Sequence, residues 1–316
     1  MENKIRISVV MSAYNASKYI ANAILSVLNQ TFPWFELIII NDGSTDDTVK
    51  IIQSFTDHRI VLLSQPHKGI AAALNNGIAK TRTDYIARFD ADDICYPDRL
   101  EKQFQVLYSN PQYSIVGSAA DYIDENGEFV FTYHPPASSY EEIQKSIKSK
   151  CPFIHSTVLC KKEAILKYGG YNNHAHTFED HFLWLHVLKT EKGFNIQDPL
   201  IQVRLNPQSV TIDEKWRTKR FHKIRNATLL NEIINEKEGQ ELYRIICRQN
   251  SEKIKQSAYN SILAKKYLWN NYQPLKARKY LRKVITQNKL DWKSYLYYCA
   301  SFLPANQLQK LYRLLK

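Results

Sequence analysis

The chain has 316 residues, 44% of them hydrophobic, and a formal net charge of +12 at pH 7. This length allows one large core or two domains, and no apolar run approaches the roughly 20 residues that cross a bilayer as a helix. The five cysteines are odd in number, widely spaced and without a C-x-x-C pair, which fits a reducing compartment with neither a disulfide framework nor a zinc site.

The charge is distributed unevenly along the chain. Residues 1–214 carry 20 Lys and Arg against 25 Asp and Glu, whereas residues 215–316 carry 23 against 6. The two regions therefore have net charges of −5 and +17, so we expect them to have different functions. The sequence predicts a first domain over 1–214 and a basic, aromatic-rich helical domain over 215–316.

The first third of the chain alternates between strand and helix patterns. Apolar, β-rich runs predict four strands, at 5–11, 35–40, 59–63 and 85–89. Helical periodicity predicts the connections, at 18–30, after the turn "NDGSTDDT" and at 69–80. This order predicts an α/β fold with a mostly parallel sheet and helices on both faces. Right-handed crossovers then place the loops after the strands on one edge, where such sheets bind ligands.

The rest of the chain is less regular before it becomes helical. Strand patterns occur at 114–122, 128–133, 154–160 and 194–204. The segment "FEDHFLWLHVL" at 178–188 predicts a helix, and helical patterns with interleaved Tyr, Trp, Lys and Arg fill the region after residue 215. Basic helices with Trp suit an anionic membrane surface, and a packing or oligomerisation domain is the alternative. No nucleic-acid motif is present, so we expect no nucleic-acid partner.

Three acids follow the fourth predicted strand within four residues, namely Asp90, Asp92 and Asp93. Like charges this close repel one another, so they are either a solvated turn or a site for a cation. Carboxylate oxygens after a strand suit Mg²⁺ or Mn²⁺, which share their ligands with substrate phosphates. The chain has no G-x-G-x-x-G or P-loop pattern, so a metal would have to balance phosphate charge.

Seven segments follow one another in a characteristic order: "SVVMSAYNASKYIANAILSVLNQTF", "ELIIINDGSTDDT", "GIAAALNNGI", "YIARFDADD", "IHSTVLCKKEAILKYGGY", "FEDHFLW" and "VRLNPQSVT". Together, over roughly residues 5–211, they resemble family 2 glycosyltransferases of the GT-A fold. The later segments resemble most the bacterial lipooligosaccharide and capsule enzymes, including β-1,3-N-acetylglucosaminyltransferases. The resemblance implies inverting transfer of a hexose or N-acetylhexosamine from a UDP-sugar, with divalent Mn²⁺ or Mg²⁺, to a surface glycan or lipid-linked glycan.

The resemblance implies a nucleotide-binding set that comprises Ala13, Tyr14, Asn15, Asp42, Lys68, Arg88 and Asp90. Tyr14 would lie against the base, and Asp42 would accept the imide N–H of uracil, for which a carboxylate is a good partner. A turn and helix cap is the alternative reading of these two loops. Lys68 and Arg88 are equally interpreted as ordinary surface cations.

The resemblance also implies the catalytic groups. Asp90 and Asp92 would hold the metal and diphosphate, Asp92 more directly, so that charge on the leaving group is stabilised. Asp180 would be the base for the acceptor hydroxyl, with Glu179 as its orienter or as an acceptor contact. Both acids begin a predicted helix, where the dipole favours anions, so a charge pair that only stabilises the helix is the alternative.

Two further residues are acceptor-binding candidates, Trp184, four residues after Asp180, and His155. A core tryptophan and a hydrogen-bonded strand histidine are the alternatives. Many relatives have His where this chain has Asn206, a weaker oxygen ligand, which puts metal affinity in question.

We therefore expect a cytoplasmic, metal-dependent glycosyltransferase that is peripheral on the inner face of the cell membrane. A nucleotide-sugar hydrolase and a nucleotide-binding scaffold without turnover are the alternatives.

Overall fold

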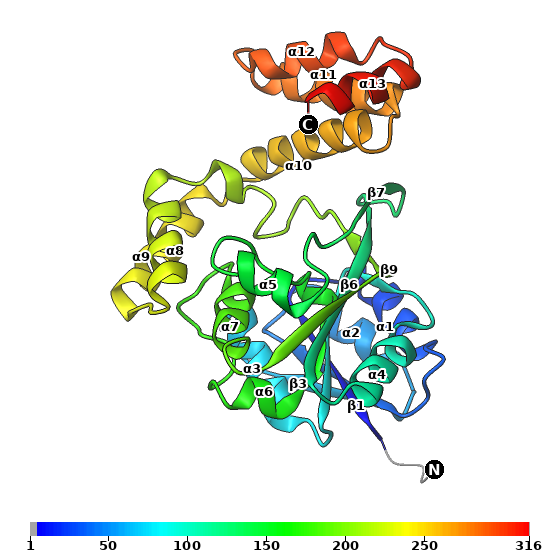
Figure 1. Cartoon of the computed structure of the whole chain (residues 1–316), viewed down its shortest axis with the longest axis vertical. Helices are drawn as coiled ribbons and strands as arrows, with labels where there is room; N and C mark the ends of the chain where they lie inside the picture. Colours follow the sequence, from blue (N-terminus) through cyan, green and yellow to red (C-terminus); the bar gives the residue numbers. More distant parts are fainter. Residues whose placement is uncertain (1–4, 316) are drawn as a thin grey trace. The chain divides into compact units, whose positions relative to one another are not determined.

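The computed structural model describes residues 5–315 and forms two compact units (Figure 1). Unit 1 comprises 5–120, Tyr133–Val203 and Lys219–Tyr243. Unit 2 comprises Asp121–Thr132, Arg204–Thr218 and 244–315. Each unit is thus assembled from segments distant in sequence, and the boundary after residue 214 stays a prediction.

Within the described residues, one nine-stranded sheet has the order β3-β2-β1-β4-β8-β6-β9-β5, with β7 beside β6. The pairs β1–β2, β1–β4 and β2–β3 are parallel, whereas β4–β8, β6–β8 and β5–β9 are antiparallel. The strands are β1 Ile7–Ala13, β2 Phe35–Asn41, β3 Ile60–Ser64, β4 Tyr85–Asp90, β5 Ile94–Cys95, β6 Tyr113–Ile123, β7 Phe129–Tyr133, β8 Leu159–Lys161 and β9 Lys192–Arg204. The predicted α/β fold, with a parallel sheet in its first half, is confirmed.

The helices up to residue 249 are α1 Ile20–Leu28, α2 Thr48–Gln53, α3 Ile70–Lys80, α4 Arg99–Ser109, α5 Tyr140–Ser146, α6 Lys162–Leu166, α7 Glu179–Val187, α8 Lys219–Asn231 and α9 Glu236–Gln249. Every residue of β2 is buried, as expected for a strand covered on both faces. The crossovers from β1 to β2 and from β2 to β3 run in one direction, and α1 packs on α2. The return from β3 to β4 reverses direction, so strand order switches between β1 and β4, where ligands bind in such sheets.

One predicted strand, 154–160, is only partly present. Residues His155–Thr157 form a 3₁₀ turn, and β8 begins at Leu159. The turn is stabilised because Thr157 donates both its N–H (2.9 Å) and its hydroxyl (2.8 Å) to the carbonyl oxygen of Ile154. The local side-chain bond competes with strand pairing here, which the apolar pattern does not reveal.

Unit 2 contains the helices α10 Glu252–Trp269, α11 Pro274–Gln287, α12 Trp292–Ala300 and α13 Ala305–Leu315 (Figure 1). Its core consists of the side chains of Val130, Phe131, Tyr259, Leu263, Ala264, Tyr267, Leu268, Ala277, Tyr280, Leu281 and Leu308. The first two come from β7, so the hairpin at 121–132 packs with the helices far along the chain. In the described part of the chain, no helix combines the length and apolar character that crossing a membrane requires.

Candidate active site

Three strand ends meet at one edge of the sheet. In the register of the parallel strands, Ala13 of β1 lies beside Asn41 of β2, and Ser12 lies beside Asp90 of β4. The N–H of Asp42 donates to the carbonyl oxygen of Ala13 (2.9 Å), which joins the first two loops directly. The prediction that the loops after these strands lie together is therefore confirmed.

The loop after β1 is tied to the loop after β2 by Asn15. This residue has φ +48°, a left-handed conformation that Asn tolerates. Its N–H donates to the Ser44 hydroxyl (3.0 Å), and its Oδ1 accepts the N–H of Thr45 (2.8 Å). These bonds fix the neighbouring Tyr14, whose ring stacks on His67 with centroids 4.1 Å apart. Tyr14 is 48% exposed, so an aromatic surface remains open at this edge, and His67 is a candidate that the sequence pattern did not indicate.

Asp42 is buried and holds the turn that leads into α3. Its Oδ1 accepts Gln65 Nε2 (2.7 Å) and the Lys68 N–H (2.9 Å). Its Oδ2 accepts the Gly69 N–H (2.8 Å) and lies 2.9 Å from His67 Nδ1. Each carboxylate oxygen of Asp42 thus has two partners. Binding of uracil by Asp42 stays a prediction, and it requires that one of these hydrogen bonds be shared with the uracil N–H or replaced by it. The Lys68 side chain is exposed at the same turn.

The acids after β4 have a cationic partner within the protein. Arg88, two residues upstream, is buried and forms an ion pair with Asp90. Burial by itself would lower the pKa of Arg88, but the adjacent Asp90 carboxylate outweighs burial and raises it. The interpretation of Arg88 as a surface cation is therefore wrong, and part of the repulsion among the acids is offset without a metal.

Asp90 and Asp92 are both partly exposed at the exit of β4. Among residues 5–315 no group of three or more His, Cys, Asp or Glu side chains is arranged to hold a metal ion. Two carboxylates nevertheless fit Mg²⁺ or Mn²⁺ when phosphate and water supply the other oxygen ligands. Asn206 belongs to unit 2, where its Oδ1 accepts the Gln208 N–H (2.9 Å) and closes a turn.

Two acids begin α7, and their surroundings differ. Glu179 is buried, and its Oε2 has no hydrogen-bond partner. Burial, reinforced by the neighbouring Asp180, raises the pKa of Glu179 to about 8, so this carboxyl is neutral at neutral pH. Asp180 is more exposed, and it accepts the His181 N–H (2.7 Å) and the Cys151 thiol (3.4 Å). Asp180 is thus the accessible carboxyl of the pair.

The segment before α7 contains an unusual backbone conformation. Thr177 has φ +72°, which is rare for a β-branched residue. It lies two residues before Glu179, at the turn that orients the start of α7. Strained residues of this kind cluster at functional sites, where the surrounding structure maintains them.

The turn at His155–Thr157 lies between the exit of β4 and α7, because its Ser156 hydroxyl accepts the Asp90 N–H (3.2 Å) and its His155 ring lies 6.5 Å from the ring of Trp184. His155 Nε2 lies 2.8 Å from Tyr171 Oη. Burial, followed by the charge of Arg88, lowers the pKa of His155 well below its ordinary value, so the imidazole is neutral. The same charge acts on Tyr171, whose pKa burial raises well above its ordinary value, and on Glu179. His155 and Tyr171 are thus in contact, and both lie, with Glu179, within electrostatic range of Arg88.

Tyr171 was not indicated by the sequence pattern, although a signal precedes it. Gly169 and Gly170 have φ values of +77° and +79°, which non-glycine residues rarely adopt. A side chain on Gly170 would also lie 2.5 Å from Asn75 Oδ1. The two glycines permit the turn that brings Tyr171 to His155.

Trp184 is completely buried, at 0% exposure. Its ring meets Phe153 edge-on with centroids 5.8 Å apart, and the rings of His155 and Tyr171 each lie 6.5 Å away. This burial leaves no face open to a sugar, so it does not support the prediction that Trp184 stacks on an acceptor. In this structure Trp184 packs behind the His155–Tyr171 pair.

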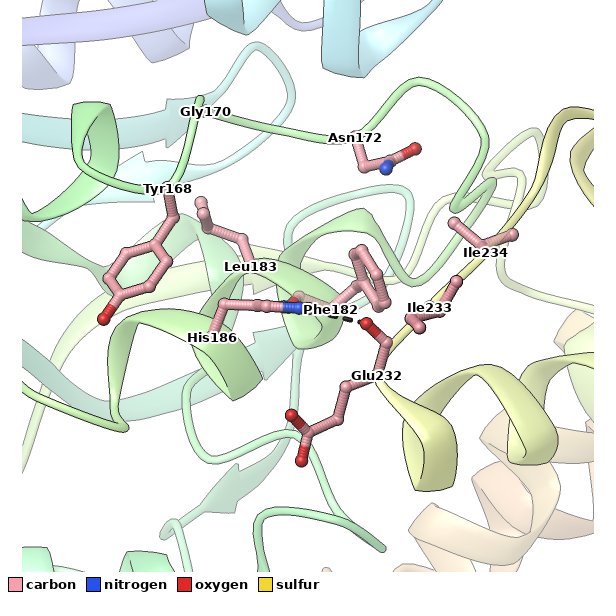
Figure 2. A pocket seen from close by; sticks show the side chains of 9 residues that line it. All are labelled: Tyr168, Gly170, Asn172, Phe182, Leu183, His186, Glu232, Ile233 and Ile234. Carbon is pink, nitrogen blue, oxygen red and sulfur yellow. Dashed lines mark hydrogen bonds between the residues drawn. The ribbon is translucent and has the colours of Figure 1, made fainter.

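A cavity of about 300 Å³ lies beside α7 (Figure 2). It is lined by Tyr168, Gly170, Asn172, Phe182, Leu183, His186, Glu232, Ile233 and Ile234. His186 Nε2 lies 3.1 Å from the carbonyl oxygen of Glu232, which ties α7 to the segment after α8. The cavity walls therefore include the residues on either side of Tyr171 and those that follow Asp180.

Comparison with known proteins shows that the chain is similar to glycosyltransferases. The family model "Glycosyl transferase family 2" matches residues 8–169. The O-antigen biosynthesis glycosyltransferase WbnJ of Escherichia coli is 35% identical over 209 residues, which cover 64% of this chain and 81% of WbnJ. The putative glycosyltransferase EpsE of Bacillus subtilis is 34% identical over 206 residues, covering 63% and 73% of the two chains.

Two solved structures share the fold at 14% identity. Staphylococcus aureus TarS 1–349 in complex with UDP-GlcNAc has a TM-score of 0.57 and covers 98% of this chain and 92% of its own. The mannosyltransferase PcManGT of Pyrobaculum calidifontis, in complex with GDP-Man and Mn²⁺, has a TM-score of 0.55 and covers 94% and 86%. The architecture is thus the GT-A arrangement that the sequence predicted.

Proposed function

The chain belongs to glycosyltransferase family 2, and we propose that it transfers a hexose or N-acetylhexosamine from a UDP-sugar, with inversion, to a hydroxyl of a growing surface glycan. Support for the glycan class comes from relatives named for O-antigen and amylovoran biosynthesis. Support for the donor comes from a structural neighbour in complex with UDP-GlcNAc. Five free cysteines agree with a cytoplasmic location.

One observation carries the proposal. The β4 exit and α7 both adjoin the turn at His155–Thr157, because the Asp90 N–H donates to the Ser156 hydroxyl (3.2 Å) and the His155 ring lies 6.5 Å from the ring of Trp184. A donor diphosphate beside Asp90 and an acceptor hydroxyl beside Asp180 would then face each other across this turn. Holding reactants in this way supplies much of the acceleration in group transfer.

The reaction follows from the roles of these side chains. Tyr14 and Asp42 would hold the nucleoside, while Asp90 and Asp92 would hold Mn²⁺ or Mg²⁺ with the diphosphate. When bound, such an ion stabilises negative charge on the diphosphate. Asp180 takes the proton from the acceptor hydroxyl, whose oxygen forms the new bond to the anomeric carbon. The bond from that carbon to the phosphate oxygen breaks, and its electron pair leaves with UDP.

Glu179 has a different role in this proposal. A carboxyl that is neutral at neutral pH is a poor proton acceptor but a good hydrogen-bond donor. Its unpartnered Oε2 is buried, so it is placed to orient the base rather than to contact the acceptor. In this proposal Asp180 is therefore the base, and Glu179 orients it.

We also propose that the cavity beside α7 receives part of the acceptor glycan. Ile233 is on its rim and 71% exposed, so Ile233→Trp should obstruct the opening without disturbing the core. We expect KM for the acceptor to rise several-fold while KM for the donor stays constant. Leu230→Trp, at an exposed position of α8 that does not line the cavity, is the matched control. Equal effects of the two substitutions would exclude this acceptor site.

The proposed function is tested with a panel of nucleotide sugars in the presence of Mn²⁺ or Mg²⁺. Nucleotide release is measured with and without acceptor glycans, and the products are identified by mass spectrometry. We expect release that depends on acceptor and adds one sugar to it. Release of free sugar without acceptor would instead indicate a hydrolase, and nucleotide binding without release would indicate a scaffold.

A further inference from the structure

The outward face of α12 is apolar. Trp292 is 64% and Leu296 57% exposed, and Tyr295 and Cys299 are exposed as well. These four residues are spaced three or four apart, so they lie on one face of the helix. Leu290, just before the helix, is 89% exposed. We call these five residues the α12 stripe.

The opposite face of α12 already packs on unit 2. Ser294 is buried, and Tyr297, Tyr298 and Ala300 pack against the aromatic core. The helix also packs on α11. A surface helix ordinarily has one apolar face, directed to the core, with polar residues opposite it. A second, exposed apolar face marks an interaction site.

The surroundings of the stripe are strongly basic. Residues 274–315 contain nine Lys and Arg but only one acid, Asp291. That acid is engaged, because its carboxylate accepts the hydroxyl (2.7 Å) and N–H (3.4 Å) of Ser294 and caps α12. Lys289 and Lys293 flank the stripe, and Lys293 Nζ lies 5.7 Å from the centre of the Trp292 ring. The partner must therefore combine an apolar layer with negative charge.

We propose that the α12 stripe docks on an anionic lipid bilayer. Leu290, Trp292 and Leu296 enter the boundary between headgroups and acyl chains, and Lys289 and Lys293 contact the lipid phosphates. Trp is enriched at this depth, and basic residues near an anionic surface strengthen binding. A second copy of the chain is a poorer occupant, since two basic surfaces would repel each other.

The test uses the full chain and vesicles of phosphatidylcholine with or without phosphatidylglycerol. In a co-sedimentation assay, Leu290→Ser with Leu296→Ser should lower partitioning onto anionic vesicles about ten-fold or more. The matched control is Leu230→Ser, an exposed leucine of α8 (65% exposed) outside the stripe, which should leave partitioning unchanged. If the double variant partitions onto anionic vesicles as strongly as the wild type does, the proposal is overturned.

Two further measurements separate lipid from other occupants. Brominated lipids should quench the fluorescence of the wild type more than that of Trp292→Phe, as expected for an indole within the bilayer. In sedimentation velocity without lipid, a dimer that the double substitution abolishes would identify the stripe as a self-contact and overturn the proposal. Sugar transfer to a soluble acceptor should stay unchanged in the double variant, so failure of the glycosyltransferase proposal would be seen separately.

Discussion

The two units differ in how they use buried ionisable groups. In unit 1, the buried Arg88 pairs with Asp90, and its charge also acts on His155, Tyr171 and Glu179 from three other segments. In unit 2, Asp124 accepts the N–H groups of residues two and four positions further along, and Asp213 pairs with Arg217 four residues away and accepts Gln249 Nε2 (3.1 Å). Bonds of this kind stabilise turns and join neighbouring segments. Convergence of distant charged groups with shifted pKa values is typical of an active site.

The difference indicates a division of labour. At the candidate active site, unit 1 maintains the strained backbone of Thr177 and the unpartnered Oε2 of Glu179, and both cost stability. Unit 2 has an aromatic core, with Tyr259, Tyr267 and Tyr280 buried among its helices. We therefore expect substitutions of buried polar groups to alter catalysis in unit 1 and packing alone in unit 2.

The largest effect should come from the acids that we place in the reaction. Asp180→Asn removes the base, so transfer should fall roughly 10²–10⁴-fold while nucleotide affinity is kept. Asp92→Ala should impair both transfer and metal-dependent UDP binding. Turnover assays and calorimetry with UDP and Mn²⁺ measure the two quantities. The control is Asp198→Ala, an exposed carboxylate on β9 that should leave both unchanged; activity retained in Asp180→Asn would remove the proposed base.

A large effect on stability should follow from the loss of the buried cation. Arg88→Met leaves the Asp90 carboxylate without its partner. Because that side chain is 33% exposed and keeps part of its hydration, the unfolding free energy should fall by about 1–3 kcal/mol. The matched pair is Arg220 with Glu241, which is exposed, and Arg220→Met should cost about 1 kcal/mol or less. Urea denaturation compares the two. Similar losses would mean that the Arg88–Asp90 pair has no special energetic role.

A smaller effect should depend on pH. Because the pKa of Glu179 is raised from 4.5 to about 8, the folded protein retains a proton that the unfolded chain has released between these values. The stability from this group is thus present at low pH and is lost as pH rises toward 8. Glu179→Gln stays neutral, so its stability relative to wild type should increase by about 2 kcal/mol from pH 6 to pH 8.

The control for this titration is Glu191→Gln. The Ser114 hydroxyl lowers the pKa of Glu191, which places its contribution in the acid range. Its difference from wild type should therefore be constant between pH 6 and pH 8. A constant difference for Glu179→Gln as well would show that Glu179 is already ionised at neutral pH.

The smallest effect concerns unit 2. Tyr259 Oη accepts the Glu125 N–H (3.1 Å), whereas the buried Tyr267 Oη has no hydrogen-bond partner. Tyr259→Phe should therefore cost about 1 kcal/mol, while Tyr267→Phe should be neutral or stabilising. Thermal unfolding measures both. Loss of sugar transfer in either variant would contradict the assignment of unit 2 to packing.

The parallel half of the sheet was predictable because each strand is a continuous apolar run followed by a turn. Asp90 and Asp180 could be named, but the sequence could not show that Arg88 is buried and paired with Asp90. Burial of Trp184 was equally hidden, since helical spacing from Asp180 does not distinguish an acceptor contact from a core residue. Contacts such as Tyr171 with His155 depend on a turn that only the folded chain defines.

The central claim is that the β4 exit and the start of α7 are two sides of one active site. A crystal structure with UDP and Mn²⁺ tests it most directly. We expect the uracil against Tyr14, the ion and diphosphate at Asp90 and Asp92, and the Asp180 carboxylate facing the diphosphate across a space for one sugar. Nucleotide bound away from β4, or Asp180 directed away from the nucleotide, would contradict the claim.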